Sequence, residues 1–271
     1  MGRRRLIIAN WKMHLISKDV SHFFETFAGL QSATTTRGRG SVYPDVLVAA
    51  PATLLKITAE SSQNRNGLRV IAQNVHASAQ GAFTGEISTD MIRDAAASGS
   101  IVGHSERRQY FAETDETVAA KTRRLLECGM VAITCVGESL AEREAGTTDA
   151  VIRRQMRPIM DALQPLITGS AASPDLLQRW AIAYEPVWAI GTGKAATAGQ
   201  AQDVHCRIRD EVAEHLSKDC ANAIRVLYGG SVKAGNIREF LDQSDIDGAL
   251  VGGASIDPQG FSDIVDAAII I

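Results

Sequence analysis

Eight short runs of apolar, often β-branched residues recur along the chain, each separated from the next by a segment long enough for a helix. Most of these runs are continuously apolar, which is typical of parallel strands that are covered on both faces. The predicted strands are Arg5–Asn10, Val46–Ala50, Arg69–Asn74, Ser100–Gly103, Val131–Val136, Ala181–Glu185, Arg225–Tyr228 and Gly248–Val251.

The segments between the strands have helical spacing, as Ala198–Leu216 illustrates. Its apolar residues recur every three or four positions, at Ala201, Val204, Ile208, Val212 and Leu216. Eight successive βα units favour a closed (β/α)8 barrel over a doubly wound sheet. A chain of 271 residues is long enough for two domains, but such barrels reach this length and no linker is evident. We therefore expect residues 1–271 to form a single α/β barrel domain.

Charge and cysteine content exclude several classes of function. A net charge of −3 argues against a nucleic-acid partner, which requires a basic face. The basic residues Arg3–Arg5 precede an apolar run too short for a secretion signal, and no stretch is long enough to span a bilayer. The four cysteines form no C-x-x-C pair, which fits free thiols in the cytoplasm: Cys128, Cys135, Cys206 and Cys220.

Polar residues and glycines follow most of the predicted strands. In a barrel of this kind, the catalytic groups gather at the carboxyl ends of the strands. The strand ends in question carry Asn10-Trp11-Lys12, Gln73-Asn74, His104-Ser105-Glu106, Glu185, Gly229-Gly230-Ser231 and Gly252-Gly253. Each of these alone is more simply explained as a turn or a solvated strand end. Their joint occurrence at one mouth favours an active site.

The glycine-rich ends of the last two strands indicate the kind of ligand. Backbone N–H groups at Gly230-Ser231 and Gly252-Gly253 are suited to hold an anion, and this is the usual phosphate site of the fold. Neither a P-loop nor a G-x-G-x-x-G fingerprint is present, so we expect a small phosphorylated metabolite rather than a nucleotide. Without paired histidine ligands or an H-E-x-x-H motif, we expect no metal and no cofactor.

A carboxylate, an imidazole and an ammonium group above a phosphate site suit proton abstraction next to a carbonyl. A general base contributes about 10²–10⁴-fold to such a reaction. The enediolate that forms also requires fixed electrophiles. Glu185 is the candidate base, and Lys12 and His104 are the candidate electrophiles.

Eight segments carry a resemblance to a known family. They are ANWKM (9–13), AQNV (72–75), GAFTGEIS (81–88), GHSERR (103–108), CVGES (135–139), AYEPVWAIGTGK (183–194), YGGSV (228–232) and GALVGGAS (248–255). In this order they resemble the triosephosphate isomerase family, from Ile7 to about Ala267. The resemblance implies a barrel that interconverts dihydroxyacetone phosphate and D-glyceraldehyde 3-phosphate through an enediolate, in glycolysis and gluconeogenesis.

The resemblance also implies a role for each catalytic residue. Glu185 would move the proton between the two carbons, and His104 would act as a neutral imidazole that donates to the carbonyl oxygens, as is known of the family. Lys12 would balance the phosphate and enediolate charges, and Asn10 would orient the substrate oxygens. Glu106 would be a second acid paired with the lysine.

The family also has a phosphate grip and a lid. Gly191, Ser231, Gly252 and Gly253 would hold the phosphate through their N–H groups, together with Asn10 and Lys12 at the same mouth. The lid would span Pro186–Ala196, with hinges at Pro186–Trp188 and Lys194–Ala196. Its residues include Pro186, Val187, Trp188, Ala189, Ile190, Gly191, Thr192, Gly193 and Lys194. Closure would protect the enediolate from loss of phosphate.

The family is homodimeric, and Thr84 in the GAFTGE loop would approach the Asn10 and Lys12 region of the partner subunit. The residues alone favour an ordinary glycine-rich loop at Gly81–Glu86. Two other functions stay open at this point. One is isomerisation of a four-carbon ketose phosphate, which needs a roomier pocket. The other is a non-catalytic phosphate-binding barrel, which would have lost Lys12, His104 or Glu185, and none of these is lost.

Overall fold

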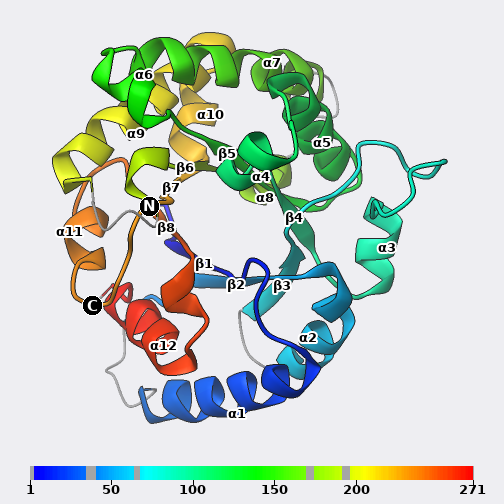
Figure 1. Cartoon of the computed structure of the whole chain (residues 1–271). Helices are drawn as coiled ribbons and strands as arrows, with labels where there is room; N and C mark the ends of the chain where they lie inside the picture. Colours follow the sequence, from blue (N-terminus) through cyan, green and yellow to red (C-terminus); the bar gives the residue numbers. More distant parts are fainter. Residues whose placement is uncertain (1–2, 35–40, 64–67, 169–173, 191–195, 271) are drawn as a thin grey trace.

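Eight parallel strands close into a barrel in chain order, and β1 pairs with β8 to complete it (Figure 1). The computed structural model describes residues 3–34, 41–63, 68–168, 174–190 and 196–270. The strands are β1 (Leu6–Asn10), β2 (Asp45–Ala50), β3 (Leu68–Ala72), β4 (Gly99–Val102), β5 (Val131–Val136), β6 (Trp180–Tyr184), β7 (Arg225–Tyr228) and β8 (Gly248–Val251). The predicted (β/α)8 barrel is confirmed.

Helices surround the barrel on the outside (Figure 1). The α-helices are α1 (Ser17–Thr34), α2 (Leu55–Ser62), α3 (Thr89–Asp94), α4 (Ser105–Tyr110), α5 (Asp115–Glu127), α6 (Leu140–Glu144), α7 (Thr148–Thr168), α8 (Pro174–Arg179), α9 (Ala198–His215), α10 (Lys218–Ala223), α11 (Ile237–Leu241) and α12 (Pro258–Ala267). The short 3₁₀ helices are η1 (Ala52–Leu54), η2 (Val187–Ala189) and η3 (Gly253–Ser255). No helix among the described residues is long and apolar enough to cross a membrane.

The continuously apolar strands are explained by two separate cores. In β1, Leu6 and Ile8 belong to a cluster that fills the barrel, whereas Ile7 and Ala9 belong to the larger cluster under the helices. This alternation follows from the two-residue period of a strand. Both faces are therefore apolar, and the alternating pattern of a half-exposed strand is missing.

Strand and helix ends differ from the prediction by one or two residues. The largest difference is at β3, which ends at Ala72 instead of Asn74. Beyond the strand, the side-chain amide of Gln73 donates to the carbonyl of Ala49 at 2.9 Å. Likewise, β6 ends at Tyr184, so Glu185 is the first residue of the loop rather than the last of the strand. These shifts place the polar side chains at the mouth.

The basic residues before β1 bind across the opposite, amino-terminal face of the barrel. Arg3 Nε lies 2.6 Å from Asp247 Oδ1. Arg4 Nε donates to the carbonyl of Tyr43 at 2.9 Å. Arg5 donates to backbone carbonyls of α11 and the end of α12. These contacts anchor the start of β1 at the end of the barrel away from the mouth.

Candidate active site

A pocket of about 260 Å³ at the mouth of the barrel brings most of the predicted site residues together. It is lined by Asn10, Lys12, His104, Glu185, Ile190, Gly229, Gly230, Ser231, Val232, Lys233, Leu250, Gly252, Gly253 and Ala254. These residues come from the ends of β1, β4, β6, β7 and β8. The pocket therefore contains both the candidate base and the candidate phosphate grip.

The carboxylate of Glu185 is buried, with 2% of the residue exposed. Its Oε2 accepts a hydrogen bond from the N–H of Ser105 at 2.8 Å, and its Oε1 accepts one from Ser105 Oγ at 3.2 Å. Oε1 also lies 3.1 Å from Nε2 of His104. Three donors thus fix the position of one carboxylate that is almost fully shielded from solvent.

His104 caps the amino-terminal end of α4. Its Nδ1 accepts from the N–H of Glu106 at 3.3 Å, which requires a lone pair on Nδ1. The proton of a neutral ring then lies on Nε2, the nitrogen that faces Glu185. The donating role of the imidazole toward a substrate stays a prediction.

Lys12 has a positive φ of 51°, a backbone conformation that residues other than glycine rarely adopt. Its N–H donates to Asn10 Oδ1 at 3.1 Å, and its Nζ lies 2.5 Å from Glu106 Oε1. The side chain passes close to the end of β8, where a Cβ on Gly252 would lie 3.3 Å from Lys12 Cε. The ammonium group is therefore held between the acid of α4 and the glycine turn after β8.

Two glycines are required by the position of Glu185. A Cβ at Gly229 would lie 2.9 Å from Glu185 Cγ. A Cβ at Gly137, in the loop after β5, would lie 1.8 Å from the carbonyl oxygen of Glu185. From the sequence, Gly229 is expected only in the turn of an anion site, and no role is expected for Gly137.

The start of the predicted lid is bound to the loop after β5. Trp188 is half-buried in η2, and its Nε1 donates to Glu138 Oε1 at 2.8 Å. The hydroxyl of Tyr184 donates to the same oxygen at 3.0 Å, and the Arg143 guanidinium lies 5.0 Å from the Trp188 ring centre. Burial and the Glu138 carboxylate raise the pKa of Tyr184, so it stays a donor. The predicted lid residues Gly191, Thr192, Gly193 and Lys194 lie outside the described residues.

Sequence reasoning missed the functions of Ser105 and Glu138. Ser105 follows His104 in GHSERR, but its partner Glu185 is 80 residues away along the chain. Glu138 stands in CVGES, and its partners Tyr184 and Trp188 are 46 and 50 residues away. Cys135 packs inside the barrel as expected. Burial, with the Glu185 carboxylate as a second cause, raises the pKa of its thiol.

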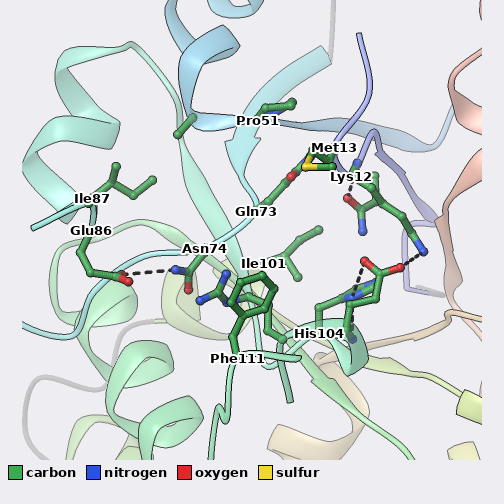
Figure 2. Close-up of a pocket in the computed structure, with 15 residues that line it drawn as sticks. Lys12, Met13, Pro51, Gln73, Asn74, Glu86, Ile87, Ile101, His104 and Phe111 are labelled. Atoms are coloured by element: carbon green, nitrogen blue, oxygen red, sulfur yellow. Dashed lines mark hydrogen bonds and ion pairs between the residues drawn. The ribbon is translucent and has the colours of Figure 1, made fainter. Parts of the chain in front are cut away.

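A second pocket of about 350 Å³ adjoins the first and shares Asn10, Lys12 and His104 with it (Figure 2). Its wall includes Met13, Pro51, Gln73, Asn74, Glu86, Ile87, Ile101 and Phe111. Thr84 is exposed on the loop between β3 and α3, which projects from the barrel (Figure 1), and it lines neither pocket.

Comparison with known proteins agrees with this geometry. The family model described as triosephosphate isomerase matches residues 5–268. Curated relatives named triosephosphate isomerase include proteins of Solibacter usitatus (42% identical, covering 97% of this chain and 99% of the relative) and Chlorobium luteolum (43%, 98% and 99%). The protein of Taenia solium is 42% identical over 98% of this chain and 99% of its own length. With the match extending over nearly every residue of the barrel, the chain belongs to the triosephosphate isomerase family.

Proposed function

We propose that this protein interconverts dihydroxyacetone phosphate and D-glyceraldehyde 3-phosphate in glycolysis and gluconeogenesis, with Glu185 as the base. Family membership supports the reaction. The roles of the residues are supported by one observation: Glu185, His104 and Lys12 line the same pocket as the glycine turns after β7 and β8. Its volume of about 260 Å³ suits a small phosphorylated metabolite.

Glu185 takes the proton from one carbon of the substrate, and the electron pair of that C–H bond forms the enediolate. The negative charge develops on the carbonyl oxygen, to which His104 Nε2–H donates. The Lys12 ammonium stabilises the same charge, and Asn10 orients the substrate oxygens. Glu106 orients Lys12 through the 2.5 Å contact. His104 gives its Nε2 proton to that oxygen and takes the hydroxyl proton from the oxygen of the neighbouring carbon, so the imidazole is regenerated. Return of the proton from Glu185 to the adjacent carbon then completes the isomerisation.

Glu185 has to exchange partners before it acts as the base. In the structure its carboxylate is directed at Ser105 and His104. Substrate binding makes the imidazole donate to the carbonyl oxygen, which leaves the carboxylate free to turn toward the C–H bond. A base must come within hydrogen-bond reach of the proton that it removes.

The phosphate is held by backbone N–H groups of Ser231, Gly252 and Gly253, with Gly191 contributed by the lid. The lid over Pro186–Lys194 closes on the bound phosphate and excludes water. The binding energy of the non-reacting phosphate is thereby used at the reacting carbons. This grip is supported by the position of the two glycine turns in the wall of the pocket.

The protein acts as a homodimer of single-domain barrels spanning residues 1–271. The loop that carries Thr84 enters the second pocket of the partner subunit, beside that subunit's lysine. Exposed apolar side chains around this pocket and loop support the assembly, since Met13 is 95%, Phe111 65% and Phe83 45% exposed in the single chain. The four free cysteines support a cytoplasmic location.

The test is an isomerase assay of the purified full chain in buffer with a chelator, since no metal or cofactor enters the reaction. Glu185→Gln should lower kcat by several orders of magnitude and leave binding of glycerol 3-phosphate, which lacks the reacting carbonyl, within a few-fold. Glu127→Gln, at an exposed position on α5, is the matched control and should keep full activity. Near-normal turnover by Glu185→Gln would remove it as the base.

A second substrate in the same assay tests the size of the pocket. A four-carbon ketose phosphate should turn over far more slowly than dihydroxyacetone phosphate, because a longer sugar needs a roomier pocket under the closed lid. Equal kcat/KM for the two sugars would show that the chain is not specific for trioses.

A further inference from the structure

Three potential metal ligands meet on the last turn of α9. Glu211, Glu214 and His215 each place a ligand atom within 4.8 Å of those of the other two, and no other such group of three occurs in the described part of the chain. Their spacing of three and four residues puts them on one face of the helix. Because the helix of a βα unit runs back from the mouth, the end of α9 lies toward the amino-terminal end of the barrel, away from the active site.

Glu211 supplies a buried carboxylate oxygen that lacks a donor. The residue is 6% exposed, and its Oε1 is held by Arg153 Nε of α7 at 3.0 Å. Its Oε2 is buried and accepts no hydrogen bond from any residue that the structure describes. This oxygen lies 3.7 Å from Nδ1 of His215. A buried acceptor without a donor is costly, so a cation bound here would relieve that cost.

The contact of His215 with its own helix engages only one of its two ring nitrogens. Its Nδ1 lies 2.9 Å from the carbonyl oxygen of Glu211, where an Nδ1–H group donates. The lone pair of Nε2 is then available, and a bond from the other ring nitrogen to a backbone carbonyl is the usual support of a metal-binding histidine. The end of a helix also favours a cation, because its last carbonyls carry partial negative charge.

We propose that Glu211, Glu214 and His215 bind one Zn²⁺ ion. One imidazole and two carboxylates are ligands that zinc accepts, whereas calcium and magnesium sites are built from oxygen alone. Water completes the coordination, because Glu214 is exposed. The ion joins the last turn of α9 to the Arg153–Glu211 contact with α7, so it stabilises the barrel wall and takes no part in the isomerisation.

Calorimetric titration of the metal-free full chain with ZnCl₂ tests the site. Saturable binding of one ion per chain is expected, together with a rise in Tm. Glu214→Gln and His215→Ala should each weaken the affinity about tenfold or more. Both variants should keep the isomerase kcat, so the outcome is independent of the proposed catalytic role of Glu185.

Two variants at positions outside the group serve as controls. His22→Ala removes an exposed histidine of α1, and Cys206→Ser removes an exposed thiol of α9 that also has affinity for zinc. Both should bind zinc as the unaltered chain does. Loss of binding in Cys206→Ser, or unchanged binding in both Glu214→Gln and His215→Ala, would overturn the proposal, as would the absence of saturable binding.

Discussion

Gly137 and Glu185 approach each other so closely that a Cβ on the glycine would lie 1.8 Å from the carbonyl oxygen of the glutamate. Gly137→Ala must therefore displace the backbone that carries the base. We expect kcat to fall about 10²-fold, as for displacements near 1 Å, with a smaller change in glycerol 3-phosphate binding. Gly199→Ala is the control, because nothing lies within 4 Å of that Cβ. Equal kcat in the two variants would contradict this reasoning.

Much of the fold could be predicted from the sequence because its signal is local. A continuous apolar run such as Val131–Val136 shows that both faces of the strand are buried, and eight such runs leave few other architectures. The ends of the strands could be predicted less well. The polar pair Gln73-Asn74 follows β3 without a local stop signal, and the partner of the Gln73 side chain, the carbonyl of Ala49, lies 24 residues earlier in the chain.

The site was predictable where a residue acts through its own type and its position after a strand, as at Lys12 and His104. It was not predictable where a residue acts on a distant partner. Ser105 reads as an ordinary helix start, and only the closed barrel brings Glu185 to it. The same holds for Glu138, whose carboxylate meets Tyr184 and Trp188 only because β5 and β6 are neighbours.

Ser105→Ala should have a mild effect, because the N–H donor to Glu185 Oε2 remains when the hydroxyl is removed. A hydrogen bond to a charged group contributes about 1.5–3 kcal/mol, and this one is long at 3.2 Å, so we expect the low end of that range and a change in kcat of roughly tenfold. Steady-state kinetics of this variant beside Glu185→Gln would measure the difference. A loss as large as that of Glu185→Gln would mean that the hydroxyl itself takes part in the chemistry.

Trp188→Phe and Tyr184→Phe each remove one donor to the same oxygen of Glu138. Both should cost about 1.5–3 kcal/mol of unfolding free energy, the range for a hydrogen bond to a charged group, measured by urea denaturation. Only the tryptophan belongs to the proposed lid, so only Trp188→Phe should also change kcat and KM. If the tyrosine variant altered the kinetics as strongly, Glu138 would act on the site directly rather than through the lid.

Lys121 is a buried cation that supports the loop between β3 and α3. Its Nζ binds Glu113, which is also buried, and Asn74 Oδ1 at 2.9 Å. Lys121→Met should destabilise the fold by about 3–5 kcal/mol, because among the described residues it leaves the buried Glu113 carboxylate with the 3.4 Å contact to Arg107 alone. Adding Glu113→Gln should recover part of the loss. Urea denaturation of both variants would show whether the unpaired charge, rather than lost packing, is the cause.

His205 is fully buried, and burial lowers its pKa from 6.5 to about 4. Between these values the unfolded chain binds a proton at this residue and the folded chain does not. The contribution of His205 to stability is therefore complete above pH 6.5 and decreases as the pH falls toward 4. Its full size is roughly 3 kcal/mol, from about 1.4 kcal/mol per pH unit.

Urea denaturation at several pH values, compared between the native chain and His205→Gln, measures this contribution. The native chain should lose more stability than the variant between pH 6.5 and 4, because glutamine does not titrate. His22→Ala, which removes an exposed histidine, should follow the native chain. The same pH slope in the native chain and His205→Gln would show that the buried imidazole is not responsible for the acid sensitivity.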